Sequence, residues 1–237
     1  MVGRAPIAVA LDAPDLETAA RWAGLVTPHV SALKIGLELY LRYGPQVVAS
    51  VRGASGAEIF LDLKLHDIPA TVAGAARAVA RLRPALLTVH AAAGTAAIRA
   101  AAEAIPASRI VAVTVLTSLG EADLAQMGIA GPVSGAVRRL AALAVEAGAR
   151  GLVCSPQEVT AVRAEVGDDI MLITPGVRPA GADANDQARV ATPEEALRSG
   201  ADLLVIGRPI TGAADPGAAA AAIAASLRRA DAITGRR

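Results

Sequence analysis

The chain alternates between short apolar runs and longer segments of helix-forming residues, and this alternation limits its possible folds more than any other feature. The runs are almost continuously apolar, which is typical of parallel strands buried on both faces. Eight such runs can be traced, and they predict an α/β fold, a (β/α)8 TIM barrel. The predicted strands are Ile7–Asp12, Ala32–Gly36, Glu58–Lys64, Leu86–Ala91, Ile110–Leu116, Gly151–Ser155, Met171–Gly176 and Leu203–Arg208.

The segments between the runs are rich in Ala, Leu, Arg and Glu, which favour helix. Asp15 is placed to cap the first helix, and the pairs Thr192-Pro193 and Ser155-Pro156 each put a proline at a first helical position. The predicted helices include Leu16–Leu25, Ala70–Leu82, Gly135–Ala147, Pro193–Ser199 and a C-terminal helix around Ala218–Ala225.

Length and composition predict one barrel domain that spans residues 1–237. The chain has 237 residues, and no linker or break in composition divides it. The main interruption is Pro175–Asp186, which is rich in Gly, Pro, Asp and Asn and lacks helical periodicity. Loops of this length inside compact domains are commonly functional, so we expect this one to serve a site.

Charge and cysteine content narrow the functional classes. The formal net charge is +1, so we expect neither nucleic acid nor a membrane surface as a partner. We find no signal peptide and no apolar run of membrane-spanning length. The single cysteine, Cys154, excludes an internal disulfide framework and is predicted to be a buried small hydrophobe. Together these features favour a cytoplasmic protein.

Polar residues stand at the ends of nearly all the predicted strands. In a parallel barrel these ends meet at one rim, where the active sites of this fold lie. Their convergence favours a catalytic site over a purely structural role. The residues are Asp12, Lys34, Asp62 with Lys64, His90, Thr117, Ser155, the turn at 176–178 and Gly207-Arg208.

The third predicted strand carries the pattern Asp-x-Lys-x-x-Asp, formed by Asp62, Lys64 and Asp67. Strand alternation places Asp62 and Lys64 on one face, and Asp67 follows in the next loop. Charges this close to a core must be paired, either as a structural ion cluster or as a catalytic network. His90 is interpreted as a supporting residue, and no cluster has the spacing of a metal site.

The pair Gly207-Arg208 follows an apolar strand, in the part of a barrel that commonly binds phosphate. Glycine lets the backbone approach an anion, and arginine adds a planar cation. These properties favour a phosphate site over a tight turn with a solvated arginine.

The run Phe60–Thr71, FLDLKLHDIPAT, closely resembles the signature of the orotidine 5′-monophosphate decarboxylase family. The resemblance extends along nearly the whole chain, and its motifs together are highly specific. The other matching segments are Ala8–Asp12, Leu33–Gly36, Val113–Ser118, Thr174–Pro179 with Asp186-Gln187, and Val205–Ile210.

The resemblance implies an enzyme that converts orotidine 5′-monophosphate to uridine 5′-monophosphate and CO2, as a homodimer and with no metal or other cofactor. Lys64 would stabilise the carbanion left at C6 and donate the proton that replaces CO2. Asp62 and Asp67 would keep Lys64 in its ammonium form. The charge network would comprise Lys34, Asp62, Lys64 and Asp67, and the residues that reach the neighbouring subunit's site would be Asp67, Ile68 and Thr71.

The remaining residues implied by the resemblance bind the nucleotide, the one small-molecule partner expected. Asp12 would contact the ribose, and Thr117, assisted by Ser118, would lie beside the nucleotide. The phosphate would be held by Arg178, Gln187, Gly207 and Arg208, with Gln187 also bridging toward the base.

Three alternatives remain. A Mg²⁺-dependent 3-keto-L-gulonate 6-phosphate decarboxylase of the same superfamily shares Asp-x-Lys-x-x-Asp, but Lys34, the loop from Arg178 to Gln187 and the lack of further metal ligands argue against it. A non-catalytic phosphate-binding barrel would be expected to have lost one charge of the set, and all are present. A Schiff-base aldolase needs a neutral lysine, whereas neighbouring carboxylates favour the charged form of Lys64.

Overall fold

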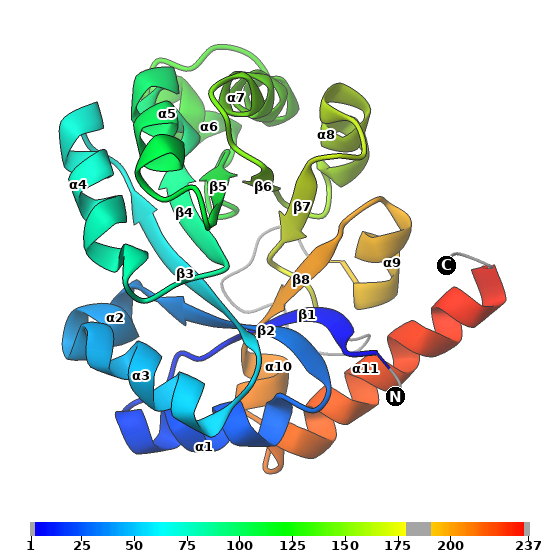
Figure 1. Ribbon diagram of the computed structural model, residues 1–237. Helices are drawn as coiled ribbons and strands as arrows, with labels where there is room; N and C mark the ends of the chain where they lie inside the picture. Colours follow the sequence, from blue (N-terminus) through cyan, green and yellow to red (C-terminus); the bar gives the residue numbers. More distant parts are fainter. Residues whose placement is uncertain (1–2, 179–190, 235–237) are drawn as a thin grey trace.

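The computed structural model describes residues 3–178 and 191–234, the last four of them only in their backbone. Eight parallel strands close into a barrel in chain order, β1 to β8 (Figure 1). The predicted TIM barrel is therefore confirmed. The strands are β1 Ala5–Ala10, β2 Val30–Gly36, β3 Glu58–Leu65, β4 Leu86–His90, β5 Arg109–Val113, β6 Gly151–Val153, β7 Met171–Thr174 and β8 Leu203–Ile206.

Helices surround the barrel on its outside (Figure 1). None of those in the described part of the chain combines the length and apolar character needed to cross a bilayer. The helices are α1 Leu16–Val26, α2 Leu37–Tyr43, α3 Pro45–Ala54, α4 Pro69–Ala80, α5 Thr95–Ala104, α6 Glu121–Gln126, α7 Val133–Glu146, α8 Val159–Val166, α9 Pro193–Arg198, α10 Arg208–Thr211 and α11 Pro216–Thr234, with a 3₁₀ turn at Ala91–Ala93.

Two of the three predicted helix starts are confirmed. The Asp15 carboxylate caps α1 by accepting a hydrogen bond of 2.7 Å from the Thr18 N–H, and Thr192 caps α9 ahead of its proline. The prediction for Ser155-Pro156 is wrong, because α8 begins only at Val159. The Ser155 N–H and hydroxyl both donate to the Glu158 carboxylate, and this local turn takes up the residues before the helix.

The predicted strands extend too far at their carboxyl ends. β1, β5, β6, β7 and β8 each end two or three residues before the predicted limit. The reason is that apolar residues past the last strand pair, such as Leu11, Val115 and Cys154, are also buried. The apolar pattern follows burial, which continues past the last strand residue, so several polar residues assigned to strand ends lie in the loops that follow.

The interior of the barrel is filled by its own side chains. Phe60, the only phenylalanine in the chain, is 1% exposed and packs with small and aliphatic residues from other strands. This cluster comprises Ala8, Ala32, Phe60, Leu86, Val111, Ile173 and Leu203. Because the interior is packed, a ligand must bind at a rim.

Candidate active site

A pocket opens at the rim where the strands have their carboxyl ends. Its volume of about 290 Å³ is close to that of sites for small ligands. Phe60 contributes to its lining, so the packed interior meets the pocket there. Of the residues predicted for the site, the pocket brings together Asp12, Lys34, Asp62, Lys64, Thr117, Arg178, Gly207 and Arg208.

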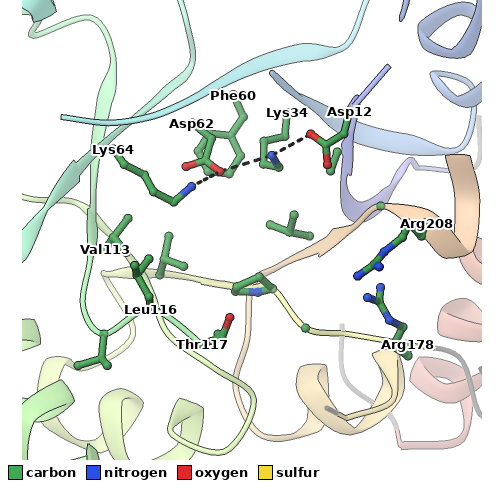
Figure 2. Close-up of a pocket in the computed structure, with 17 residues that line it drawn as sticks. Asp12, Lys34, Phe60, Asp62, Lys64, Val113, Leu116, Thr117, Arg178 and Arg208 are labelled. Carbon is green, nitrogen blue, oxygen red and sulfur yellow. Dashed lines mark hydrogen bonds and ion pairs between the residues drawn. The ribbon is translucent and has the colours of Figure 1, made fainter. Parts of the chain in front are cut away.

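Four side chains of alternating charge form a row along one side of this pocket (Figure 2). Asp62 Oδ2 lies 2.8 Å from Lys64 Nζ and 3.4 Å from Lys34 Nζ. Lys34 Nζ lies 3.8 Å from Asp12 Oδ1. One oxygen of Asp62 is therefore shared by two ammonium groups.

Asp62 is buried, yet its surroundings favour the charged form. Burial alone would raise the pKa of Asp62, but the ammonium groups of Lys34 and Lys64 and hydrogen bonds from Lys64 and Thr88 outweigh it and lower the pKa. The carboxylate therefore remains ionised at neutral pH. The ionised carboxylate stabilises the fold at pH values above the pKa that Asp62 has in the unfolded chain. This stabilisation is lost as the pH falls through the lowered pKa of Asp62 in the folded state.

Lys34 and Lys64 are the two lysines of the whole chain, in which every other basic side chain apart from histidine is arginine. An ammonium can release a proton in a reaction, whereas a guanidinium stays charged under all ordinary conditions. Both groups able to act in this way therefore lie in the pocket. The sequence displays this signal, which the predictions from motifs leave unused.

The backbone at Lys64 departs from regular strand geometry. Its φ is 48°, in the left-handed region that a residue with a side chain rarely adopts. The pairing of β3 with β4 is irregular at the same place, between Leu61 and Leu65. The hydroxyl of Thr88 also contacts this segment. Thr88 is not among the predicted site residues, and its only signal in the sequence is a polar residue inside an apolar run.

Two arginines occupy the far end of the pocket from Lys64. Figure 2 shows the side chains of Arg178 and Arg208 pointing toward each other. Arg178 is buried after β7, while Arg208 is the exposed first residue of α10. Two guanidinium groups that converge in this way favour an anion near them.

Several predicted site residues do not line this pocket. Asp67, Ile68 and Thr71 lie in an exposed segment after β3, and Ser118 is exposed after β5. Within the described part of the chain the Asp67 carboxylate forms no ion pair; it accepts a hydrogen bond of 2.6 Å from the N–H of Ile68. Gln187 and most of the loop at 175–186 lie outside the described residues.

His90 and His66 lie against each other, with ring centroids 5.1 Å apart. Burial, together with the nearby His66 and Lys64, lowers the pKa of His90 against the opposing effect of Asp62. His90 is therefore neutral at neutral pH. Among the side chains that the structure describes, no group of three or more His, Cys, Asp or Glu residues is arranged to hold a metal ion.

Comparison with known proteins gives matches over nearly the whole chain. The model of the orotidine 5′-phosphate decarboxylase / HUMPS family matches residues 5–223. Orotidine 5′-phosphate decarboxylase of Thermobifida fusca is 74% identical over 95% of this chain and 97% of the relative. The enzyme of that name from Frankia casuarinae is 62% identical over 95% of this chain and 88% of the relative. The crystal structure of orotidine 5′-phosphate decarboxylase from Lactobacillus acidophilus superposes with a TM-score of 0.81 at 36% identity, covering 94% of this chain and 99% of that one.

Cys154 lies beside this rim but is sealed from solvent. It is 1% exposed, and burial, with a contribution from the Glu158 carboxylate, raises the pKa of its thiol to about 12. We predict that iodoacetamide at about pH 8 will not alkylate the folded protein, because the thiolate is the reactive species. Intact mass spectrometry should find one added group only after unfolding in guanidinium. Rapid alkylation of the folded protein would contradict the assigned burial.

Proposed function

This chain belongs to the orotidine 5′-phosphate decarboxylase / HUMPS family, and on that premise we propose that it converts orotidine 5′-monophosphate to uridine 5′-monophosphate and CO2. This is the last step of de novo pyrimidine nucleotide biosynthesis. The observation that supports the proposal best is the division of the pocket, with a row of alternating charges along one side and two converging arginines at the far end. A nucleotide has a matching division, with a pyrimidine at one end and a phosphate dianion at the other.

The arginine end serves as the handle for the phosphate in this proposal. Arg208 and Arg178 bind the dianion through charge-assisted hydrogen bonds, next to Gly207 and with Gln187. Asp12 meets the ribose between the two ends, and Thr117 lies beside the nucleotide. Binding energy from the phosphate, which does not react, is then available to align the pyrimidine with Lys64.

The chemistry takes place at the Lys64 ammonium. The bond from C6 to the carboxylate breaks, its electron pair stays on C6, and CO2 leaves. Lys64 stabilises the developing negative charge and then transfers a proton from Nζ to C6, after which solvent restores the proton on the lysine. Asp62 lies 2.8 Å from Lys64 Nζ and holds the ammonium in place. The proposed reaction needs neither a metal nor an organic cofactor.

We propose that the active form is a homodimer in which Asp67, Ile68 and Thr71 reach the partner's site. Ile68 is 66% exposed, and Leu41 on the neighbouring helix α2 is 78% exposed. Both follow adjacent strands, β3 and β2, at the rim that carries the pocket. Large apolar side chains left exposed beside a site favour a protein contact there.

The proposed function is tested by following the absorbance of orotidine 5′-monophosphate with the purified protein, with and without EDTA. We expect the absorbance to fall at the same rate in both samples. Activity that is lost in EDTA and returns with added Mg²⁺ would instead fit the alternative, a Mg²⁺-dependent 3-keto-L-gulonate 6-phosphate decarboxylase. No consumption under either condition would contradict the proposed substrate.

Lys64→Ala should abolish nearly all decarboxylation, because in the proposed mechanism Lys64 is the one ammonium of the Asp-x-Lys-x-x-Asp motif that can donate a proton to C6. The loss expected on removing the general acid is about 10²–10⁴-fold or more in kcat. Thermal unfolding and binding of uridine 5′-monophosphate serve as controls for fold and pocket. Turnover close to that of the wild type would remove Lys64 from its assigned role.

Lys64→Ala and Asp67→Ala should complement each other when mixed, if Asp67 acts in the partner's site. A mixed dimer then has one site with both defects and one with neither. With random exchange, half the dimers are mixed, so activity should recover to about a quarter of the wild-type value. Subunit exchange is checked by native mass spectrometry. Exchange without recovery would show that Asp67 serves its own subunit.

Arg208→Ala should lower kcat/KM strongly for orotidine 5′-monophosphate and barely affect orotidine, which lacks the phosphate. Loss of a charge-assisted contact costs about 1.5–3 kcal/mol, or about 10–100-fold, and the effect depends on the phosphate being present. Arg198→Ala, an exposed arginine on α9, is the matched control. Equal losses with both substrates would place Arg208 in the catalytic network instead.

A further inference from the structure

Thr88 is a polar residue in the middle of an apolar strand. It lies on β4 between Leu87 and Val89, and none of its surface is exposed to solvent. A buried hydroxyl costs free energy unless it forms hydrogen bonds. Its partners therefore indicate why a threonine, and not a valine of the same shape, stands here.

Both partners of the Thr88 hydroxyl belong to the charge network. Thr88 Oγ1 accepts a hydrogen bond of 2.8 Å from the backbone N–H of Lys64 and donates one of 3.1 Å to Asp62 Oδ1. The other carboxylate oxygen, Asp62 Oδ2, faces the two ammonium groups. Thr88 thus contacts the backbone of one charged residue and the side chain of the other.

The backbone at this place lacks a regular strand partner. Leu61 pairs with Leu87, and the next pair is Leu65 with Val89. From the first pair to the second, β3 runs four residues and β4 only two. The extra residues of β3, 62–64, therefore bulge out of the ladder opposite Thr88. The bulge is where Lys64 takes its φ of 48°. In a regular ladder, a backbone carbonyl would accept the hydrogen bond from the Lys64 N–H. The ladder is interrupted here, and the Thr88 hydroxyl accepts this hydrogen bond instead.

The geometry points to Thr88 as a positioning residue that sets both the backbone of Lys64 and the orientation of the Asp62 carboxylate. Thr88 does not line the pocket, so it acts only through these two residues. Its effect on the rate rests on the proposed function, whereas its effect on the Lys64 backbone does not. The two effects can therefore be measured separately.

The kinetic test compares Thr88→Val, which keeps the shape and removes the hydroxyl, with Thr88→Ser, which keeps the hydroxyl. For Thr88→Val we expect kcat to fall about 10–100-fold, as for other small misplacements of a reacting group. KM should change little, because the phosphate end of the pocket is untouched. The acid limb of the pH profile should also move to higher pH, since Asp62 loses a hydrogen bond that favours its ionised form. Thr88→Ser should stay within a few-fold of the wild type.

The second test needs no activity. Because the chain has two lysines, protein labelled with [15N]lysine gives two backbone amide signals, and the Lys64 signal is the one that Lys64→Ala removes. In Thr88→Val this signal should shift and its amide hydrogen should exchange faster, while Thr88→Ser keeps the wild-type behaviour. The Lys34 amide, on β2, is the internal control.

The outcomes separate the two proposals. A wild type that does not consume orotidine 5′-monophosphate contradicts the proposed function, yet the amide signal still decides the role of Thr88. Wild-type kcat and an unchanged Lys64 amide in Thr88→Val would overturn the positioning role, as would equal losses in Thr88→Val and Thr88→Ser. If Thr88→Val does not fold, Thr88→Cys, with a weakly hydrogen-bonding thiol, takes its place under the same criteria.

Discussion

The carboxylate of Asp62 is the interaction on which the site depends, because it is shared by the only two ammonium side chains in the protein. Bringing these charges close to the core is costly, and the cost is offset only while they remain paired. Removing one partner from such a buried pair typically costs about 3–5 kcal/mol. The site residues therefore support one another, and Asp62 is at once a structural and a functional group.

The packed interior of the barrel determines where this network can lie. Phe60 and its aliphatic neighbours fill the space between the strands, so the charged side chains gather directly above them at the rim. There the low-polarity floor strengthens the interactions among the charges. The phosphate end stays open to solvent at Arg208, which suits a group that must bind and release a dianion.

Much of the fold and part of the site could be predicted from the sequence. The eight apolar runs determine the barrel. Asp62 and Lys64 meet as predicted, but through a bulge and not through the regular strand alternation on which the prediction was based. The strand ends could not be placed, because Leu11, Val115 and Cys154 lie past the strand ends and are nevertheless buried. Thr88 gave one signal, a polar residue inside an apolar run, but its role follows from a bulge in the neighbouring strand that this signal does not reveal. Asp67 remains a prediction, because its proposed partner lies on a second copy of the chain.

The central claim is that one carboxylate binds both ammonium groups. Protein labelled with [13Cε]lysine has two side-chain signals, one from Lys34 and one from Lys64, and each reports the surroundings of its own ammonium group. In a folded Asp62→Asn variant, the account predicts that both signals shift from their wild-type positions. A signal from Lys34 that stays in place while that of Lys64 moves would show that Asp62 serves Lys64 alone, and would contradict the shared carboxylate.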